Sequence, residues 1–242
     1  MSDSTQLNPT SDERIKEFSK LRKALIRPEL GGIVGAVAVF TFFLLFAYDS
    51  GMFNSRGIMN WSIVSAQFVI IAVGAGLLMI AGEFDLSVGS MIGFAGMMIA
   101  IFSVTLGWPV WVAILVTFVM CLGVGALNGF IVIRTGLPSF IVTLAFLFIL
   151  RGLTIFLPQV IVRKTIIGGV KDVAEGDWLA VLFDGKILTG LFSWLGEEGL
   201  IATFERGTRA GQPIVSGVPM LIVWAIVLML FGHFLLTRTQ FG

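Results

Sequence analysis

Residues 63–90, IVSAQFVIIAVGAGLLMIAGEFDLSVGS, place two acidic side chains between two long apolar runs. The first run, Ile63–Ala81, contains no charged residue and shows no alternation of polar and apolar positions. An uncharged apolar run of about 18 residues or more is typical of a helix that crosses a membrane. We therefore predict a transmembrane helix here, a break at Gly82, and a second transmembrane helix beyond it.

The whole chain has the composition of a membrane protein. It has 242 residues, of which 57% are hydrophobic and only 13% are charged, and its mean hydropathy is +0.98. Soluble domains average about 25% charged residues, so the low charge excludes an ordinary soluble domain. We predict an all-α, polytopic membrane protein. Residues 31–158 contain six charged side chains, namely Asp49, Arg56, Glu83, Asp85, Arg134 and Arg151.

Six apolar runs are predicted to be membrane spans. They are Gly31–Ala47, Ile63–Ala81, Leu86–Val104, Val110–Ile133, Ser139–Leu157 and Ile214–Leu236. Basic residues in short loops stay on the cytoplasmic side, and residues 1–30 hold six Lys and Arg, whereas the first outer loop holds only Arg56. Arg134 and Arg238 follow spans that would end on the same side as residues 1–30. We therefore predict that both ends of the chain are cytoplasmic.

These spans divide the chain into four predicted parts. Residues 1–30 are a cytoplasmic basic tail, 31–158 a five-span membrane bundle, 159–213 an outer loop, and 214–242 the sixth span with the start of a cytoplasmic region. In the tail, Thr10 and Glu13 fit a capping box that would start a basic amphipathic helix. Such a helix would lie on membrane lipid; a solvated tail with chance periodicity is the alternative.

The outer loop 159–213 is the one sizeable segment outside the predicted spans. Its 55 residues exceed the usual length of a connection. Trp178, Phe192 and Trp194 argue against disorder and suit the headgroup level of a membrane. The loop is either a docking or gating surface for an external partner or an insertion without that role.

Glu83 and Asp85 are too costly to lie as free charges at the bilayer centre. Each would cost about 2.5–3.5 kcal/mol there, which together would cancel the whole insertion energy of the preceding span. We expect Gly82 to end one helix, and Asp85 or Ser87 to cap the next, with Gly89 in the same break. Capping is the main role expected for Asp85; lining a transport path or coupling transport to an ion is the alternative.

Three more residues in apolar runs are candidates for a transport path. Arg151 lies about 18 Å along a helix from Ser139, near the predicted outer end of its span, and either reaches the headgroups or contacts a polar path. Asn128 and Thr143 either bond neighbouring helices or line the path. Pro138 is expected to fix the start of the fifth span.

The chain lacks the residues of a metal or redox site. It has one cysteine and one histidine, Cys121 and His233, far apart in apolar runs. This excludes a disulfide framework within the chain, and no metal site or cofactor is predicted. The net charge of +1 does not indicate nucleic-acid binding, so no nucleic-acid partner is predicted.

Two motifs are similar to those of a known family. They are AGEFDLSVGSMIGFAG at residues 81–96 and GALNGFIVIRTGLPSFIVTLAFLFILRGL at residues 125–153. Together they resemble the membrane subunit of bacterial ABC importers for ribose, xylose and related sugars, over roughly residues 35–158. The D-L-S-V-G-S, N-G and L-P-S-F-I-V-T-L motifs and the later R-G-L occur in the family's order.

This resemblance implies a multi-pass permease subunit of the bacterial inner membrane, without enzymatic activity of its own. It implies a second permease copy, a separate cytoplasmic ATPase subunit, and a periplasmic sugar-binding protein that would dock on the outer loop. A proton- or ion-coupled secondary carrier, with Glu83, Asp85 or Arg151 as the coupling group, is the alternative function.

The sequence departs from the family pattern at two places. Glu83 and Phe84 stand where the family usually has glycine and an aliphatic residue, so no family role is assigned to Glu83. The family continues beyond the T-x-x-G motif, here at residues 239–242, into a segment that contacts the ATPase and into further spans. We therefore expect either a fragment or a truncated product, favour the truncated product, and expect that it does not transport alone.

Overall fold

The computed structural model describes residues 28–205 and 210–239 of the chain. The chain divides into two compact units, Met1–Asn54 and Ser55–Gly242. The amphipathic helix predicted for the basic tail lies outside the described residues, and so does the T-x-x-G motif beyond its first residue.

The first unit contains one apolar helix, α2 (Pro28–Phe46), and a short 3-10 turn, η1 (Tyr48–Ser50). α2 corresponds to the first predicted span. The chain turns at Gly51, whose φ of 80° is a left-handed conformation that glycine adopts without strain. The turn brings Phe53 back against Phe40, with the ring centroids 5.5 Å apart and the rings edge to face.

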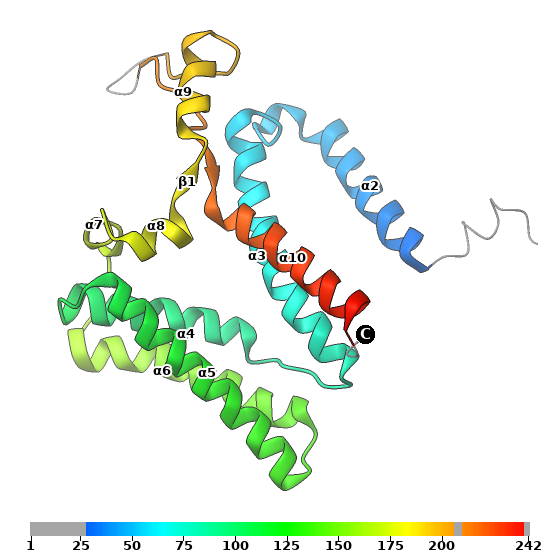
Figure 1. Cartoon of the computed structure of the whole chain (residues 1–242), viewed down its shortest axis with the longest axis vertical. Helices are drawn as coiled ribbons and strands as arrows, with labels where there is room; N and C mark the ends of the chain where they lie inside the picture. The colour runs from blue at the N-terminus through cyan, green and yellow to red at the C-terminus, as the bar shows by residue number, and fades with distance from the viewer. Residues whose placement is uncertain (1–27, 206–209, 240–242) are drawn as a thin grey trace, which may run out of the picture. The chain divides into compact units, whose positions relative to one another are not determined.

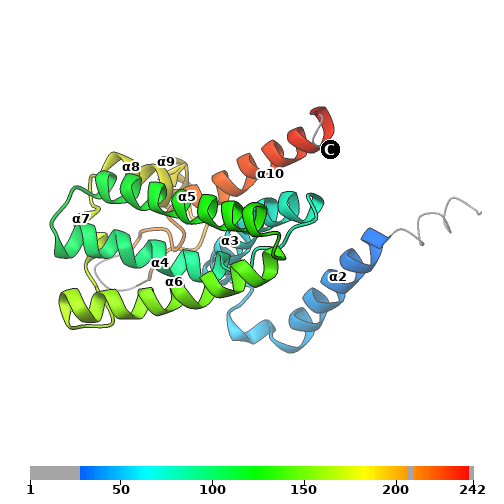
Figure 2. The ribbon, with the colours of Figure 1, turned by 90° about the horizontal axis from the view of Figure 1, so that it is seen from below.

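The second unit is also helical, apart from two strands of two residues each. α10 packs along α3, and α4, α5 and α6 pack against one another, as both ribbon views show (Figure 1, Figure 2). Its elements in order are α3 (Ser55–Ile80), α4 (Val88–Ala100), the π-helical turn η2 (Ile101–Thr105), α5 (Val110–Thr135), α6 (Ser139–Val162), α7 (Val170–Val173), α8 (Trp178–Asp184), β1 (Lys186–Ile187), α9 (Thr189–Glu197), β2 (Val218–Pro219) and α10 (Met220–Arg238).

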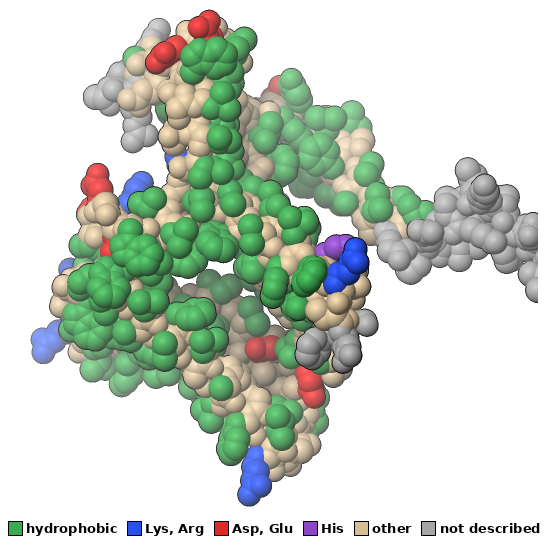
Figure 3. Space-filling model, in the orientation of Figure 1, with side chains coloured by type: hydrophobic (Ala, Val, Ile, Leu, Met, Phe, Trp, Pro, Cys, Tyr) green, Lys and Arg blue, Asp and Glu red, His purple; other side chains and the backbone are tan. Residues whose placement is uncertain are grey.

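Among the described residues, five helical stretches are long and apolar enough to cross a membrane. They are α3, α4 continued by η2, α5, α6 and α10, while the apolar part of α2, Leu30–Phe46, is shorter. Many of their large apolar side chains are exposed, and hydrophobic side chains cover much of the face drawn in the space-filling view (Figure 3). Such a surface is stable in lipid but not in water. The prediction of an all-α polytopic membrane protein is confirmed.

The buried core of the second unit lies between α4 and α6. Phe94, Met98 and Ile101 on α4 and η2 pack with Leu150 of α6. These residues recur at helical spacing on α4, which is why one face of that helix is buried. The core therefore fixes how α4 and α6 lie against each other, close to the predicted helix break.

α3 and α10 lie close together at a glycine. A Cβ atom placed on Gly232 of α10 would lie 2.9 Å from Cγ1 of Val73 on α3, closer than real Cβ contacts allow. Small residues permit such close approach between helices in membranes. Gly232 was not singled out in the sequence because an isolated glycine does not reveal its neighbour.

Three helices begin or end at other residues than the predicted spans. α3 begins at Ser55 instead of Ile63, because hydropathy marks the hydrocarbon layer and not the end of the helix. α6 continues through Pro158, which is buried, to Val162 instead of ending at Leu157. α10 begins at Met220 instead of Ile214, because Val218–Pro219 pairs as a strand with Lys186–Ile187.

In the predicted outer loop, residues 159–213, which we call the outer segment, α8 is tied to the first turn of α5. Asp177 caps α8, because its Oδ1 accepts hydrogen bonds from the N–H groups of Leu179 (3.0 Å) and Ala180 (3.1 Å). Its second oxygen, Oδ2, accepts from the N–H of Trp111 at 3.0 Å. One carboxylate thus starts α8 and joins it to α5.

The other end of α8 is tied to α10. The Leu182 carbonyl accepts a hydrogen bond of 2.9 Å from Trp224 Nε1, and the Phe183 ring stacks on the Trp224 ring with centroids 5.8 Å apart. The Gly185 carbonyl accepts from the N–H of Met220 at 2.8 Å. α8 therefore connects the start of α5 with the start of α10.

Candidate functional site

The helix break begins with a glycine at the end of α3. Gly82 has φ of 82°, and its N–H donates to the Met79 carbonyl at 3.0 Å while the Glu83 N–H donates to the Leu78 carbonyl at 3.1 Å. This pair of bonds is the Schellman arrangement that satisfies the last carbonyls of a helix. Gly82 therefore ends α3, as its sequence position indicated.

Asp85 organises the other side of the break. Its Oδ1 accepts a hydrogen bond of 2.7 Å from the Ser87 N–H and one of 2.6 Å from the Ser87 hydroxyl. Ser87 is the N-cap residue of α4, but its own side chain makes no capping bond. The sequence predicted that Asp85 or Ser87 would accept from the N–H groups of the first turn of α4; among the described residues neither side chain does so, and Asp85 instead binds the N-cap residue Ser87.

Two hydroxyl groups of α6 bind the backbone of the break. The Phe84 N–H donates to Ser139 Oγ at 3.0 Å, and the Leu86 N–H donates to Thr143 Oγ1 at 3.1 Å. The Thr143 hydroxyl also lies 2.9 Å from the Ser139 carbonyl, to which it donates. Ser139 and Thr143 are one helical turn apart, so one face of α6 supplies both hydroxyls.

Asn128 of α5 joins the same cluster. Its Nδ2 donates to Ser87 Oγ at 3.5 Å, and both residues are buried. Its Oδ1 is buried and has no hydrogen-bond donor among the described residues. We call Asp85, Ser87, Asn128, Ser139 and Thr143 the break cluster. Residues from the break, α5 and α6 thus meet at one place.

Of the other two predicted break residues, Gly89 lies elsewhere than expected and Pro138 lies where it was expected. Gly89 is inside α4, which begins at Val88, so its assignment to the break was wrong. Pro138 is the N-cap residue of α6, one position before the first helical residue, and Gly136 ends α5 in a left-handed conformation with φ of 70°. Pro138 therefore marks the start of α6, although it is not part of the helix.

Arg151 is not part of the break cluster. It lies on α6 eight residues beyond Thr143, which corresponds to about 12 Å along the helix. The sequence predicted Arg151 near the outer end of its span, but α6 runs eleven residues further to Val162. Arg151 instead lies at the middle of the helix, is exposed, and lines a groove between α4 and α6.

Ser139 is the member of the cluster that the sequence did not single out. It follows Pro138 at the start of α6, where a serine usually indicates only a helix terminus. Its bond to the Phe84 N–H spans 55 residues of sequence. No local sequence pattern predicts such a contact. The two residues belong to the two family motifs, which lie close together in the fold.

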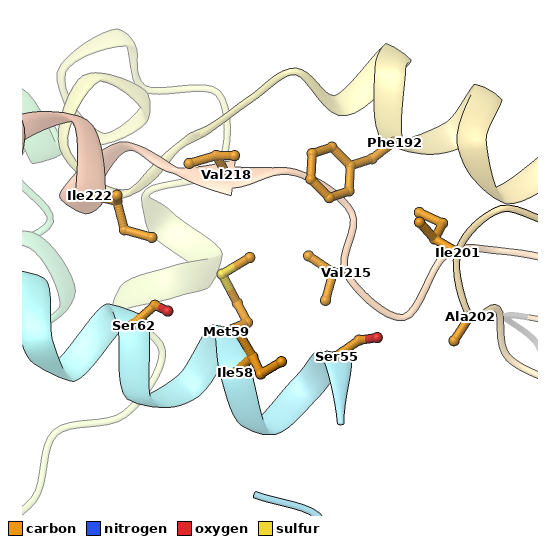
Figure 4. Close-up of a pocket in the computed structure, with 10 residues that line it drawn as sticks. All are labelled: Ser55, Ile58, Met59, Ser62, Phe192, Ile201, Ala202, Val215, Val218 and Ile222. Carbon is orange, nitrogen blue, oxygen red and sulfur yellow. The ribbon is translucent and has the colours of Figure 1, made fainter. Parts of the chain in front are cut away.

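A second hollow lies between α3, α9 and α10, and its lining is mainly apolar. It has a volume of about 220 Å³, and Met59 of α3 extends into it toward Val215 and Val218 (Figure 4). Phe192 and Ile222 close its other sides. None of the predicted site residues lines it. In the described part of the chain, no group of three His, Cys, Asp or Glu side chains could hold a metal ion.

The family described as branched-chain amino acid transport system / permease component matches residues 57–242. This match covers the break cluster, the α4–α6 groove and the outer segment. The chain belongs to this family of transport permeases. The resemblance predicted from the two motifs is therefore confirmed.

Individual relatives agree with this assignment. The chain is 30% identical over 234 residues to the xylose transport system permease protein XylH of Escherichia coli strain K12, covering 87% of this chain and 60% of that protein. It is 29% identical over 231 residues to XylH of Haemophilus influenzae, covering 86% and 62%. It is 36% identical over 104 residues to the inner membrane ABC transporter permease protein YjfF of Escherichia coli, covering 43% and 31%.

The chain spans about three fifths of the length of the XylH proteins that it matches. No solved structure is similar to it. Membership of this permease family, together with the five apolar helices, makes the chain a multi-pass protein of the inner membrane.

Proposed function

We propose that this chain is the membrane-spanning translocation subunit of an ATP-driven, binding-protein-dependent importer for monosaccharides. The observation that carries the proposal is the similarity to the xylose permease, which extends over 87% of this chain. It includes the break cluster, in which hydrogen bonds join the start of α4 to α5 and α6. A transport subunit of this kind has no enzymatic activity; a separate cytoplasmic ATPase subunit would hydrolyse ATP.

The proposed importer has three further protein components. Two copies of the permease would form the path, the ATPase would bind on the cytoplasmic side, and a periplasmic sugar-binding protein would deliver sugar to the outer segment. Trp178 of α8 and Trp194 of α9 are 64% and 51% exposed, as residues at a docking surface or in the headgroup layer would be. α8 connects α5 and α10, so docking on α8 would act on both helices.

Copurification and uptake test this proposal. The permease, produced with its ATPase and sugar-binding protein, should copurify with the ATPase and, in liposomes, hydrolyse ATP faster when the loaded binding protein is added. Uptake of labelled D-xylose, D-ribose or D-fructose should require ATP and should persist when an ionophore collapses the proton gradient. Uptake that needs no ATPase and stops with the proton gradient would reject the proposal in favour of a secondary carrier.

Deletion of part of the outer segment tests the docking surface separately. Removal of residues 189–199, which contain α9, should leave the permease–ATPase complex intact. It should abolish the stimulation of ATP hydrolysis by the binding protein, because the docking partner would be lost. Full stimulation of an intact complex would reject α9 as the docking surface.

A further inference from the structure

A groove follows the contact between α4 and α6, directly outside the break cluster. Its volume is about 490 Å³; Gly89, Ser90 and Gly93 of α4 form one side, and Arg151 and Thr154 of α6 lie on the other. A Cβ atom on Gly89 would meet nothing within 4 Å, and one on Gly93 would meet only Thr154 Cγ2, at 3.8 Å. The glycines therefore leave the α4 backbone open to another group.

The charged side chain in this groove lies at the middle of α6, a helix long enough to cross a membrane. Arg151 is twelve residues after Ser139 and eleven before Val162, so each end of α6 is about 16–18 Å away at 1.5 Å per residue. The hydrocarbon core of a bilayer is about 30 Å thick. Neither headgroup layer is therefore close to the Arg151 Cα atom.

Arg151 has no partner within residues 28–205 and 210–239. Its side chain is exposed, and it makes neither a hydrogen bond nor an ion pair there. A bare guanidinium in lipid at this depth would cost about 2.5–3.5 kcal/mol or more, and such groups instead face a water-filled cavity or a polar partner. The side of α6 that carries Arg151 is thus incompatible with lipid.

The chemistry of the groove fits a neutral polyhydroxy compound. Arg151 has five N–H donors and no acceptor, and the Ser90 hydroxyl is a further donor. No acidic side chain lines the groove, so Arg151 would repel a cation, whereas sugar hydroxyl oxygens would accept its hydrogen bonds. The volume falls in the range of about 300–1,000 Å³ that is typical of small-molecule sites.

The hydroxyl of Thr154 leaves the donor role to Arg151 and Ser90. It donates to the Leu150 carbonyl of its own helix at 2.8 Å. A sugar hydroxyl both donates and accepts, so it can accept the hydrogen bonds that Arg151 and Ser90 offer.

We propose that the α4–α6 groove is a contact site for a monosaccharide during its passage, with Arg151 donating hydrogen bonds to the sugar hydroxyls. This inference rests on the proposed function. It adds that the α4–α6 groove forms one wall of the transport path and that Arg151 is a residue that determines specificity there. The site is open along one side, which suits transient contact better than tight retention.

Cysteine labelling tests whether the groove is wet. The chain has a single native cysteine, so a Cys121→Ser variant is the background. Ser90→Cys and Ile155→Cys, both on the groove, should react with a membrane-impermeant thiol reagent in the assembled transporter. Ile149→Cys and Phe156→Cys are matched controls. Ile149, Ile155 and Phe156 are similarly exposed, at 51%, 53% and 58%, but Ile149 and Phe156 lie on another face of α6 than Ile155 and do not line the groove.

The expected difference is at least about tenfold in labelling rate, because a thiol in hydrocarbon stays un-ionised and out of reach of the reagent. D-Xylose or D-ribose at saturating concentration should slow labelling in the groove, and mannitol serves as the polyol that no pyranose site should retain. Equal labelling of Ile149→Cys and Ile155→Cys would overturn the inference, as would unreactive groove cysteines in a protein that transports.

Uptake kinetics test the role of Arg151. Arg151→Gln should lower the maximum rate of ATP-driven sugar uptake about tenfold or more, the effect of losing a charged hydrogen bond. Arg151→Lys should retain part of the rate, and KM should not change, because the binding protein captures the sugar. Wild-type rates in Arg151→Gln would overturn the inference alone; absence of ATP-driven uptake by the unsubstituted protein would overturn the proposed function.

Discussion

One carboxylate oxygen of Asp85 accepts both hydrogen bonds that hold Ser87 at the start of α4. Asp85→Leu removes this acceptor and leaves the hydroxyl proton of Ser87, a residue that is 1% exposed, without the oxygen to which it donates. We expect the variant to lose about 1–3 kcal/mol of stability, measured as a lower unfolding temperature in detergent. Asp85→Asn keeps an acceptor oxygen and should remain close to the unsubstituted protein.

Asp49 provides the control for this prediction. It is an exposed acid in η1, and Asp49→Leu should leave the unfolding temperature unchanged. If Asp85→Asn were as unstable as Asp85→Leu, the negative charge and not the acceptor would be essential. Normal assembly combined with lost uptake in Asp85→Asn would instead give Asp85 a direct role in the path.

The sequence predicted most members of the break cluster but not their partners. Asp85, Asn128 and Thr143 stand out because polar groups are rare in apolar runs. That Thr143 accepts from the Leu86 N–H depends on how α4 packs on α6. Such packing is decided by contacts between distant segments, on which local periodicity carries no information.

At the scale of the helices, hydropathy located the spans and misjudged their ends. α3 starts eight residues before the apolar run, because its first two turns carry polar residues such as Arg56 and Asn60. α6 continues through Pro158, although the missing N–H of a proline removes one helical hydrogen bond. The Pro158 side chain is buried. α10 starts late, because strand pairing with β1 takes the residues before it.

The α3–α10 contact at Gly232 leads to a prediction for helix packing. Gly232→Ala would place a Cβ atom 2.9 Å from Val73 Cγ1, and overpacking of this kind costs about 1–3 kcal/mol. The unfolding temperature in detergent should therefore fall. The double variant Gly232→Ala with Val73→Ala should recover most of the loss, since the clashing methyl group is removed.

Gly125 of α5 is the matched control for Gly232. A Cβ atom on Gly125 meets nothing within 4 Å, so Gly125→Ala should leave stability unchanged or slightly raise it, because alanine favours the helix. A Gly232→Ala variant as stable as Gly125→Ala would contradict the close packing of α3 on α10.

The capping of α8 by Asp177 leads to a second prediction at this scale. Asp177→Ala removes the acceptor for two N–H groups of α8 and for the Trp111 N–H of α5. The loss of such a cap costs about 0.5–2 kcal/mol. Protease cleavage within residues 163–219 should therefore become faster, while Asp184→Ala, an exposed acid at the other end of α8, should cleave as the unsubstituted protein does.

At the scale of the whole second unit, the helices form two groups, α3 with α10 and α4 with α5 and α6. α8 joins these groups at one end, and the helix break joins them at the other. α8 connects α5 with α10, and the break connects α3 with α4 while it binds α5 and α6. All six tryptophans lie toward the end that contains α8, as expected for a headgroup layer. They are Trp61, Trp108, Trp111, Trp178, Trp194 and Trp224.

The side of the membrane on which this tryptophan-bearing end lies is the last prediction. Arg134 and Arg238 lie in the last turns of α5 and α10, at the opposite end, and basic residues in short loops resist translocation. We therefore expect α8 and α9 in the periplasm and the end of α10 in the cytoplasm. A green fluorescent protein joined after Arg238 should fluoresce, and alkaline phosphatase inserted after Gly199 should be active. The reverse pattern, with active phosphatase after Arg238, would show that the chain is inserted with the opposite orientation, and the outer segment could then not meet a periplasmic binding protein.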